Sequence, residues 1–233
     1  MALDEALLDA AAAEGTTTLR FYRWSSPTLS LGYFQPYRER MTHPPSRWCA
    51  LVRRPSGGGA ILHDREWTYS FAAPAGSPLA VDALALFQSL HGALIDALRR
   101  QGVGARLHEA GPTVNHDKHD REPFLCFQRR AAGDVLLGEA KIAGSAQRRR
   151  RGAILQHGSL ILGTSAAAPE IPGLHELTGR TIDADALRLD WQTGIAERLG
   201  LRLADGALTH SERTLAEQLL REKYSSPAWN EKR

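Results

Sequence analysis

The spacing of apolar residues along the chain predicts several amphipathic helices. The clearest covers residues 81–100, where apolar residues recur at three- and four-residue intervals and so share one helical face. These residues are Leu84, Phe87, Leu90, Leu94 and Leu98. Residues 1–13 mix acidic and apolar positions in a similar way. Two further helices are expected over residues 182–199 and 211–223, so the chain is expected to end in helices.

Short apolar runs between turn residues predict strands in the first two thirds of the chain. The expected strands cover residues 17–22, 28–33, 50–54, 60–63, 67–72, 134–137, 141–145 and 153–163. Residues 34–48, with three prolines, and the polar residues 108–123 are expected to be loops, and the arginine-rich residues 147–152 a turn. We therefore expect one α/β domain over residues 1–233.

The composition narrows the class of protein. Hydrophobic residues make up 42% and charged residues 24%, as in ordinary globular proteins. A net charge of +3, without an aromatic stacking surface, does not indicate a nucleic-acid partner. No apolar run approaches the roughly 20 residues of a membrane span, and no basic cluster opens the chain as in a secretion signal. Two cysteines make a poor disulfide framework, so free thiols and a cytoplasmic location are expected.

The segment from Arg53 to Asp64, RRPSGGGAILHD, is the first candidate site. Three consecutive glycines allow the backbone to approach a ligand closely, and successive amides in such a loop can bind an anion. Arg53 and Arg54 add positive charge, and His63 adds a titratable group. The spacing fits neither the dinucleotide fingerprint nor the phosphate loop. On its own, the segment is equally compatible with a flexible hairpin turn.

Two later segments make the interpretation of the glycine segment more specific. KIAGSAQ begins at Lys141, and ILQHGSLI covers residues 154–161. In this order and separation, the three motifs resemble the biotin/lipoate protein ligase superfamily, specifically its lipoate branch. The opening MALDEALL and the closing KYSSPAWN, residues 223–230, also resemble that branch. The resemblance therefore spans nearly the whole chain.

The resemblance implies an α/β (α+β) fold with a mixed, mainly antiparallel sheet flanked by helices, like class II aminoacyl-tRNA synthetases and biotin ligases. It implies that Lys141 contacts the reacting acyl carbonyl. It also implies a set of substrate-binding residues, drawn from the three motifs. They are Arg54, Ser56, Gly57, Gly58, Gly59, His63, Gly144, Ser145, Ala146, His157 and Gly158. Compared with the family pattern, we expect the edge strand before the first helix to be missing, through truncation or loss, and no accessory domain after residue 230.

The superfamily contains two chemistries. Its ligases use ATP and Mg²⁺ to convert lipoate to lipoyl-AMP and pass it to a lysine of a lipoyl domain. Its octanoyltransferases move octanoate from acyl carrier protein onto an enzyme cysteine and then to that lysine, without a cofactor. The acceptor domains belong to the E2 subunits of 2-oxoacid dehydrogenases or to the glycine cleavage H protein. The ligase needs a nucleotide pocket, whereas the transferase needs a nucleophilic thiol.

Cys126 favours the transferase. It lies in EPFLCFQ, fifteen residues before Lys141, and resembles the Pro-Cys-Phe element of cysteine-dependent octanoyltransferases, with Leu125 where proline is usual. A free thiol is only a few per cent ionised at neutral pH, and a nearby ammonium such as that of Lys141 favours the thiolate. Cys49 lacks any motif and is expected to be structural. We therefore expect Cys126 and Lys141 to be catalytic, and no metal to be involved.

Other interpretations stay open at this point. An ATP-dependent ligase shares the glycine and lysine motifs, and a module that binds lipoyl domains without chemistry is a further alternative. Transfer of octanoyl between two lipoyl domains would use the same chemistry. Residues 147–152 are either a docking patch for acidic partners or a solvated turn. The histidines and carboxylates of residues 116–120 suggest a metal only weakly, and polar residues in a surface loop are the better interpretation.

Overall fold

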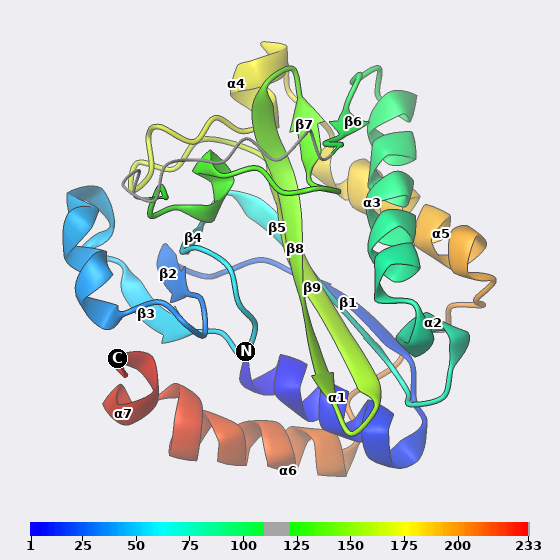
Figure 1. The fold of residues 1–233 in the computed structure, drawn as a ribbon. Helices are drawn as coiled ribbons and strands as arrows, with labels where there is room; N and C mark the ends of the chain where they lie inside the picture. Colours follow the sequence, from blue (N-terminus) through cyan, green and yellow to red (C-terminus); the bar gives the residue numbers. More distant parts are fainter. Residues whose placement is uncertain (110–121, 233) are drawn as a thin grey trace.

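The computed structural model of the protein describes residues 1–109 and 122–232. Its centre is a six-stranded antiparallel sheet in the order β1-β5-β9-β8-β7-β6 (Figure 1). The strands are β1 (Thr18–Tyr22), β5 (Glu66–Ala73), β6 (Arg106–Leu107), β7 (Val135–Leu137), β8 (Ala140–Arg150) and β9 (Ala153–Ile161). The predicted mixed, mainly antiparallel sheet flanked by helices is confirmed, but it is divided in two.

The second sheet is small and carries the glycine segment. Its order is β3-β2-β4, with β2 parallel to β3 and antiparallel to β4. The strands are β2 (Thr28–Leu31), β3 (Ala50–Arg53) and β4 (Ile61–His63). The glycine segment links β3 to β4, and Ala60 pairs with Leu125 beside it. The motif that suggested a ligand loop is therefore held at both ends by strands.

Helices cover both faces of the large sheet. Helices α3 (Ala83–Arg100) and α5 (Ala184–Leu199) pack on one face, where Tyr69, Phe71 and Trp191 belong to the main apolar core (Figure 1). The other face carries α1 (Ala2–Glu14), which packs on Ala72 and Leu155. The remaining helical segments are α2 (Pro78–Val81), α4 (Leu174–Thr178), α6 (His210–Leu219), α7 (Pro227–Asn230), the 3₁₀ turns Tyr37–Thr42, Pro44–Ser46 and Cys126–Gln128, and a π-helical turn Leu220–Tyr224.

The face of β5 that lies under α1 is polar over most of the strand and apolar at its end. Side chains alternate between the two faces of a strand, so Glu66, Thr68, Ser70 and Ala72 share this face. All four are buried, although three of them are polar. Buried polar residues in a row require partners, and the site described below supplies them.

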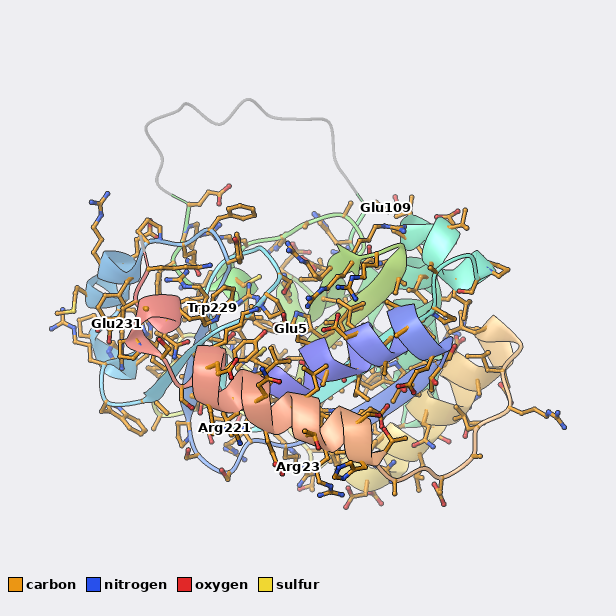
Figure 2. All side chains as sticks on the ribbon, turned by 90° about the horizontal axis from the view of Figure 1, so that it is seen from below. Glu5, Arg23, Glu109, Arg221, Trp229 and Glu231 are labelled. Atoms are coloured by element: carbon orange, nitrogen blue, oxygen red, sulfur yellow. The ribbon has the colours of Figure 1, made fainter. Side chains whose placement is uncertain are left out.

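The C-terminal motif, residues 223–230, forms hydrogen bonds to the end of β3. Helices α1 and α6 lie side by side, and Glu5 of α1 accepts hydrogen bonds from Lys223 and Tyr224 beyond α6, both at 2.6 Å (Figure 2). Further on, Trp229 donates to the backbone oxygen of Arg53 at 2.9 Å, and the Arg53 guanidinium donates to carbonyls of the same C-terminal segment. Arg53, expected beside the glycine amides, therefore points toward the C-terminus instead.

Several predicted boundaries are wrong. The arginine-rich turn is confined to Arg151 and Gly152, because the three arginines before them belong to β8. Arg150 forms ion pairs with Glu5 and Asp9, and Arg149 donates to carbonyls near α2. Most of the expected loop 108–123 and all of residues 116–120 lie outside the described residues. Within the described residues, no helix is long and apolar enough to cross a membrane.

Candidate active site

A cavity with about 510 Å³ of empty space, part of it open to solvent, lies over the polar part of the large sheet and is bounded on its other side by the small sheet. Both predicted catalytic residues line it, as do most of the predicted substrate-binding residues. Its lining residues are Met1, Tyr22, Arg54, Gly57, Gly58, Ile61, His63, Thr68, Cys126, Phe127, Lys141, Gly144, Ser145, Ala146, His157, Gly158 and Ser159. Ser56 and Gly59 are absent from this lining, but each contacts a residue of it, Ser56 through a hydrogen bond to His157 and Gly59 through its close approach to Cys126.

Cys126 and Lys141 meet at the partly exposed side of the cavity. The Lys141 Nζ lies 3.6 Å from the Cys126 Sγ and 3.5 Å from the Cys126 carbonyl oxygen. The same ammonium forms an ion pair with the Asp134 carboxylate at 2.8 Å, and both side chains of this pair are 4% exposed. The backbone amide of Ala131 donates to Asp134 at 2.7 Å and fixes its position. The Lys141 ammonium is therefore held beside the thiol by a buried carboxylate.

Lys141 reaches the cavity because β8 is irregular at this point. The pairing of β7 with β8 shifts register between Val135 and Leu136, and Lys141 then shares a face with Gly144. A Cβ atom on Gly144 would lie 2.6 Å from the Lys141 Cε and 2.9 Å from its Nζ. Only glycine leaves room for the lysine side chain to cross this strand.

The glycine segment fits against the cysteine in the same manner. A Cβ atom on Gly59 would lie 3.2 Å from the Cys126 Cα, so the absence of a side chain brings the two backbones together. The Cys126 amide donates to the Ala60 carbonyl at 2.7 Å, which locks the cysteine segment onto the end of the glycine segment. Cys126 is thus positioned by backbone contacts that leave its thiol facing the cavity.

Arg54 gives the glycine segment its shape. Its buried guanidinium donates to the carbonyls of Ser30, Gly57 and Gly59 at 2.7–3.0 Å. Burial lowers the pKa of Arg54 to about 10, so the group remains charged at neutral pH. It therefore adds positive charge to the cavity while holding the loop closed.

Ser56, His157 and Asp4 form a buried chain of hydrogen bonds. The Ser56 hydroxyl bonds to His157 Nε2, and His157 Nδ1 lies 3.3 Å from Asp4 Oδ2. Burial would raise the pKa of Asp4, but the N-terminal ammonium, His157 and Arg20 together hold it well below its usual range. The composition is that of a serine protease triad, but Ser56 does not line the cavity. We interpret the chain as a link between the glycine segment, β9 and α1.

Ser145 lines the cavity, and its hydroxyl forms hydrogen bonds with two other side chains. It bonds to Tyr69 at 2.7 Å and to His91 Nε2 at 2.6 Å. His91 lies on α3 and its Nδ1 donates to the Gly133 carbonyl at 2.7 Å, next to Asp134. Burial lowers the pKa of His91 to about 4, against the hydrogen bond to Gly133 and the nearby Asp134 charge, which raise it. His91 is therefore neutral at pH 7.

Stability is expected to fall as the pH drops from about 6.5 to about 4. The pKa of His91 is 6.5 in the unfolded chain and about 4 when buried, so the unfolded chain binds the proton more readily in this window. This one group accounts for about 3 kcal/mol over the whole window. Urea unfolding across this pH range should show a shallower dependence for His91→Gln than for the wild type. The exposed His210→Gln serves as the control, and an unchanged pH dependence in His91→Gln would contradict the assignment.

Sequence reasoning missed several residues of the site. Asp134 is the partner of Lys141, and nothing in its sequence context marks it. Asp4 lies inside the opening motif, so the resemblance could have suggested it. Glu66, Thr68 and Ser159 occupy polar positions in strands that are buried on both faces. The alternation of polar and apolar residues in β5, combined with its central place in the sheet, is the signal that could have found them.

Comparison with known proteins agrees with this geometry. Residues 1–170 match the family model described as "Lipoyl protein ligase A/B catalytic domain". Octanoyltransferase LipM of Kyrpidia tusciae is 35% identical over 257 residues, which cover 99% of this chain and 93% of the relative. Octanoyltransferase LipM of Geobacillus kaustophilus is 34% identical over 262 residues, which cover 100% of this chain and 93% of the relative.

Solved structures give the same picture of the fold. A putative lipoate protein ligase from T. acidophilum with bound lipoic acid has a TM-score of 0.77 at 26% identity and covers 99% of this chain and 91% of its own. A lipoate-protein ligase A bound with ATP has a TM-score of 0.76 at 26% identity, and the match covers 99% of this chain and 92% of the ligase chain. The cavity with Cys126 and Lys141 therefore lies in a fold that these proteins share.

Proposed function

Because the chain belongs to the lipoyl protein ligase A/B catalytic-domain family, we propose that it is an octanoyltransferase of protein lipoylation, with Cys126 as its nucleophile. The observation that carries the proposal is the 3.6 Å contact between the Cys126 Sγ and the Lys141 Nζ inside the cavity. The full-length similarity to octanoyltransferases supports the same conclusion. A thiol at this position has a role in acyl transfer and none in forming an acyl-adenylate.

The reaction proceeds in two balanced steps. In the first, the Cys126 sulfur, after losing its proton, attacks the thioester carbonyl of the donor, and the donor thiolate leaves and takes up a proton. In the second, the amine of the acceptor lysine attacks the Cys126 thioester. A C–N bond forms, the C–S bond breaks, and the amine loses a proton. The product is an octanoyl amide, and Cys126 returns to its first state.

Lys141 acts in both steps through its charge. The ammonium lies beside the sulfur, so it also lies beside the carbonyl oxygen that becomes negative during each attack. A fixed donor at such a position stabilises the transition state by about 3–4 kcal/mol in well-studied hydrolases. Asp134 keeps the ammonium in place between the two steps.

The proposal extends to partners and cofactors. The donor is octanoyl-acyl carrier protein, and the acceptor is the lysine of a lipoyl domain, in a 2-oxoacid dehydrogenase E2 subunit or the glycine cleavage H protein. The chemistry needs neither ATP nor a metal. Cys49 and Cys126 are both free thiols, which suits a reducing compartment such as the cytoplasm.

Transfer to a lipoyl domain is expected to proceed without ATP. The protein is incubated with octanoyl-acyl carrier protein and an apo lipoyl domain, and the mass of the domain is followed with and without ATP and Mg²⁺. Equal octanoylation in both mixtures is expected, because the donor thioester is already activated. A requirement for ATP, or lipoate-dependent exchange of pyrophosphate into ATP, would instead support a ligase. Binding of the domain without any modification would support a non-catalytic module.

A further inference from the structure

The cavity has a partly exposed side and a closed end. Cys126 and Gly57 are partly exposed, and Gly58 is exposed. At the other extreme, His63 is 2% exposed and Ser159 1% exposed, and both line the same cavity. An acyl chain attached to Cys126 therefore runs from the exposed side toward the end formed by the buried His63 and Ser159, in a cavity that Tyr22 also lines.

His63 at this closed end is held in a fixed orientation. Its Nδ1 bonds to the buried Glu66 carboxylate at 2.6 Å, and Ser159 donates to the same carboxylate oxygen at 2.9 Å. The ring of Trp24 stacks on the imidazole with centroids 4.3 Å apart. The remaining nitrogen, His63 Nε2, is buried and has no hydrogen-bond partner within the described residues.

Tyr22 presents a second buried polar atom in the same cavity. It pairs with Thr68 across β1 and β5, and both residues line the cavity. The Tyr22 hydroxyl is also buried, and the Asp4 carboxylate is its hydrogen-bonding neighbour. Burial raises the pKa of Tyr22 far above its usual value, with help from the nearby Asp4 and Glu66 carboxylates, so the hydroxyl keeps its proton. One nitrogen without a hydrogen-bond partner and one buried hydroxyl thus line a cavity proposed to hold an alkyl chain.

We propose that His63 and Tyr22 form a polar floor that sets the length of the acyl chain at about eight carbons. A methylene group pressed against an orphaned polar atom satisfies no hydrogen bond and removes any water that would, so chain growth beyond the floor is unfavourable. Ala60, which is hydrogen-bonded to Cys126, lies three strand residues from His63. Those residues span about 10 Å, comparable to an extended octanoyl group. This inference rests on the proposed function, because it assumes an acyl group on Cys126.

The chain-length preference of Cys126 acylation provides the test. Acyl carrier proteins loaded with six-, eight-, ten- and twelve-carbon chains are each mixed with the protein, and the rate of adduct formation is followed by intact mass. The wild type is expected to prefer eight carbons over ten by about tenfold or more, the typical effect of leaving one buried polar atom unsatisfied. Tyr22→Phe and His63→Leu are each expected to reduce that ratio several-fold and to admit the longer chains.

A matched control is available elsewhere in the chain. His43 bonds to the Glu170 carboxylate at 2.7 Å, as His63 does to Glu66, but it lies outside the cavity. His43→Leu is therefore expected to keep the wild-type ratio. Tyr22→Phe removes one buried hydroxyl and keeps the ring, so it should fold even if His63→Leu does not.

The outcomes separate the inference from the proposed function. Adducts whose chain-length ratio is the same in wild type and Tyr22→Phe would overturn the polar floor and leave the octanoyltransferase proposal intact. A ratio of eight- to ten-carbon acylation that changes as much in His43→Leu as in His63→Leu would also overturn the polar floor. No adduct with any chain length would contradict the proposed function itself.

Discussion

Lys141→Met is expected to lose both acyl transfer and several kcal/mol of stability. Lys141 and Asp134 form a buried ion pair at 2.8 Å, and removing one partner leaves an uncompensated charge in the interior. Breaking such a pair typically costs about 3–5 kcal/mol. Loss of the cation beside the reacting carbonyl should lower the rate of transfer by about 10²–10³-fold, as for other lost oxyanion donors. Urea unfolding and the rate of lipoyl-domain octanoylation measure the two effects separately.

The double variant Lys141→Met/Asp134→Asn separates stability from catalysis. It removes both charges and keeps an oxygen that can accept from the Ala131 amide, so most of the lost stability should return. Activity should stay as low as in the single variant. Lys223→Met, which breaks the more exposed pair with Glu5, is the control for loss of a lysine elsewhere. Recovery of activity in the double variant would mean that Lys141 has no direct role in the reaction.

Cys126→Ala is expected to abolish transfer while leaving the fold intact. Cys126 is only partly buried. Within the described residues, its thiol accepts a hydrogen bond from Lys141. Removing the sulfur should therefore change the free energy of unfolding by less than about 1 kcal/mol. The rate should fall by at least about 10³-fold, because removal of a nucleophile leaves only the binding and electrostatic contributions.

Cys126→Ser and Cys49→Ala complete this comparison. A hydroxyl is a much weaker nucleophile than a thiol at neutral pH, so Cys126→Ser should remain far below the wild type. Cys49 is buried in the apolar cluster beside Leu29 and Leu31, where burial raises the pKa of its thiol. Cys49→Ala should therefore keep its activity. Loss of transfer in Cys49→Ala with retention in Cys126→Ala would reverse the assignment of the nucleophile.

The sequence predicted the site residues that belong to the recognised motifs. Lys141, Cys126, Gly144 and His157 were expected to share a pocket, and all four line one cavity. The orientations of their side chains could not be predicted from the sequence. Ser145 was expected to line the acyl pocket and does line the cavity, but the sequence did not predict that its hydroxyl bonds to Tyr69 and His91.

Asp134 shows the clearest limit of sequence reasoning. Its pairing with Lys141 depends on a register shift between β7 and β8, which apolar periodicity does not reveal. The arginine-rich residues show a different limit. They were expected to be a turn because they are charged, yet Arg149 and Arg150 extend β8, since carbonyls and carboxylates of other segments bind them. Charge therefore did not show that these residues continue a strand.

Intact mass after mixing the protein with octanoyl-acyl carrier protein alone tests the central claim most directly. The wild type is expected to gain one octanoyl group, which should map to Cys126 and be released by hydroxylamine as a thioester. The adduct should disappear on addition of an apo lipoyl domain, as that domain gains the same mass. An adduct that persists in Cys126→Ala, or octanoylation of the domain without any Cys126 adduct, would contradict the account.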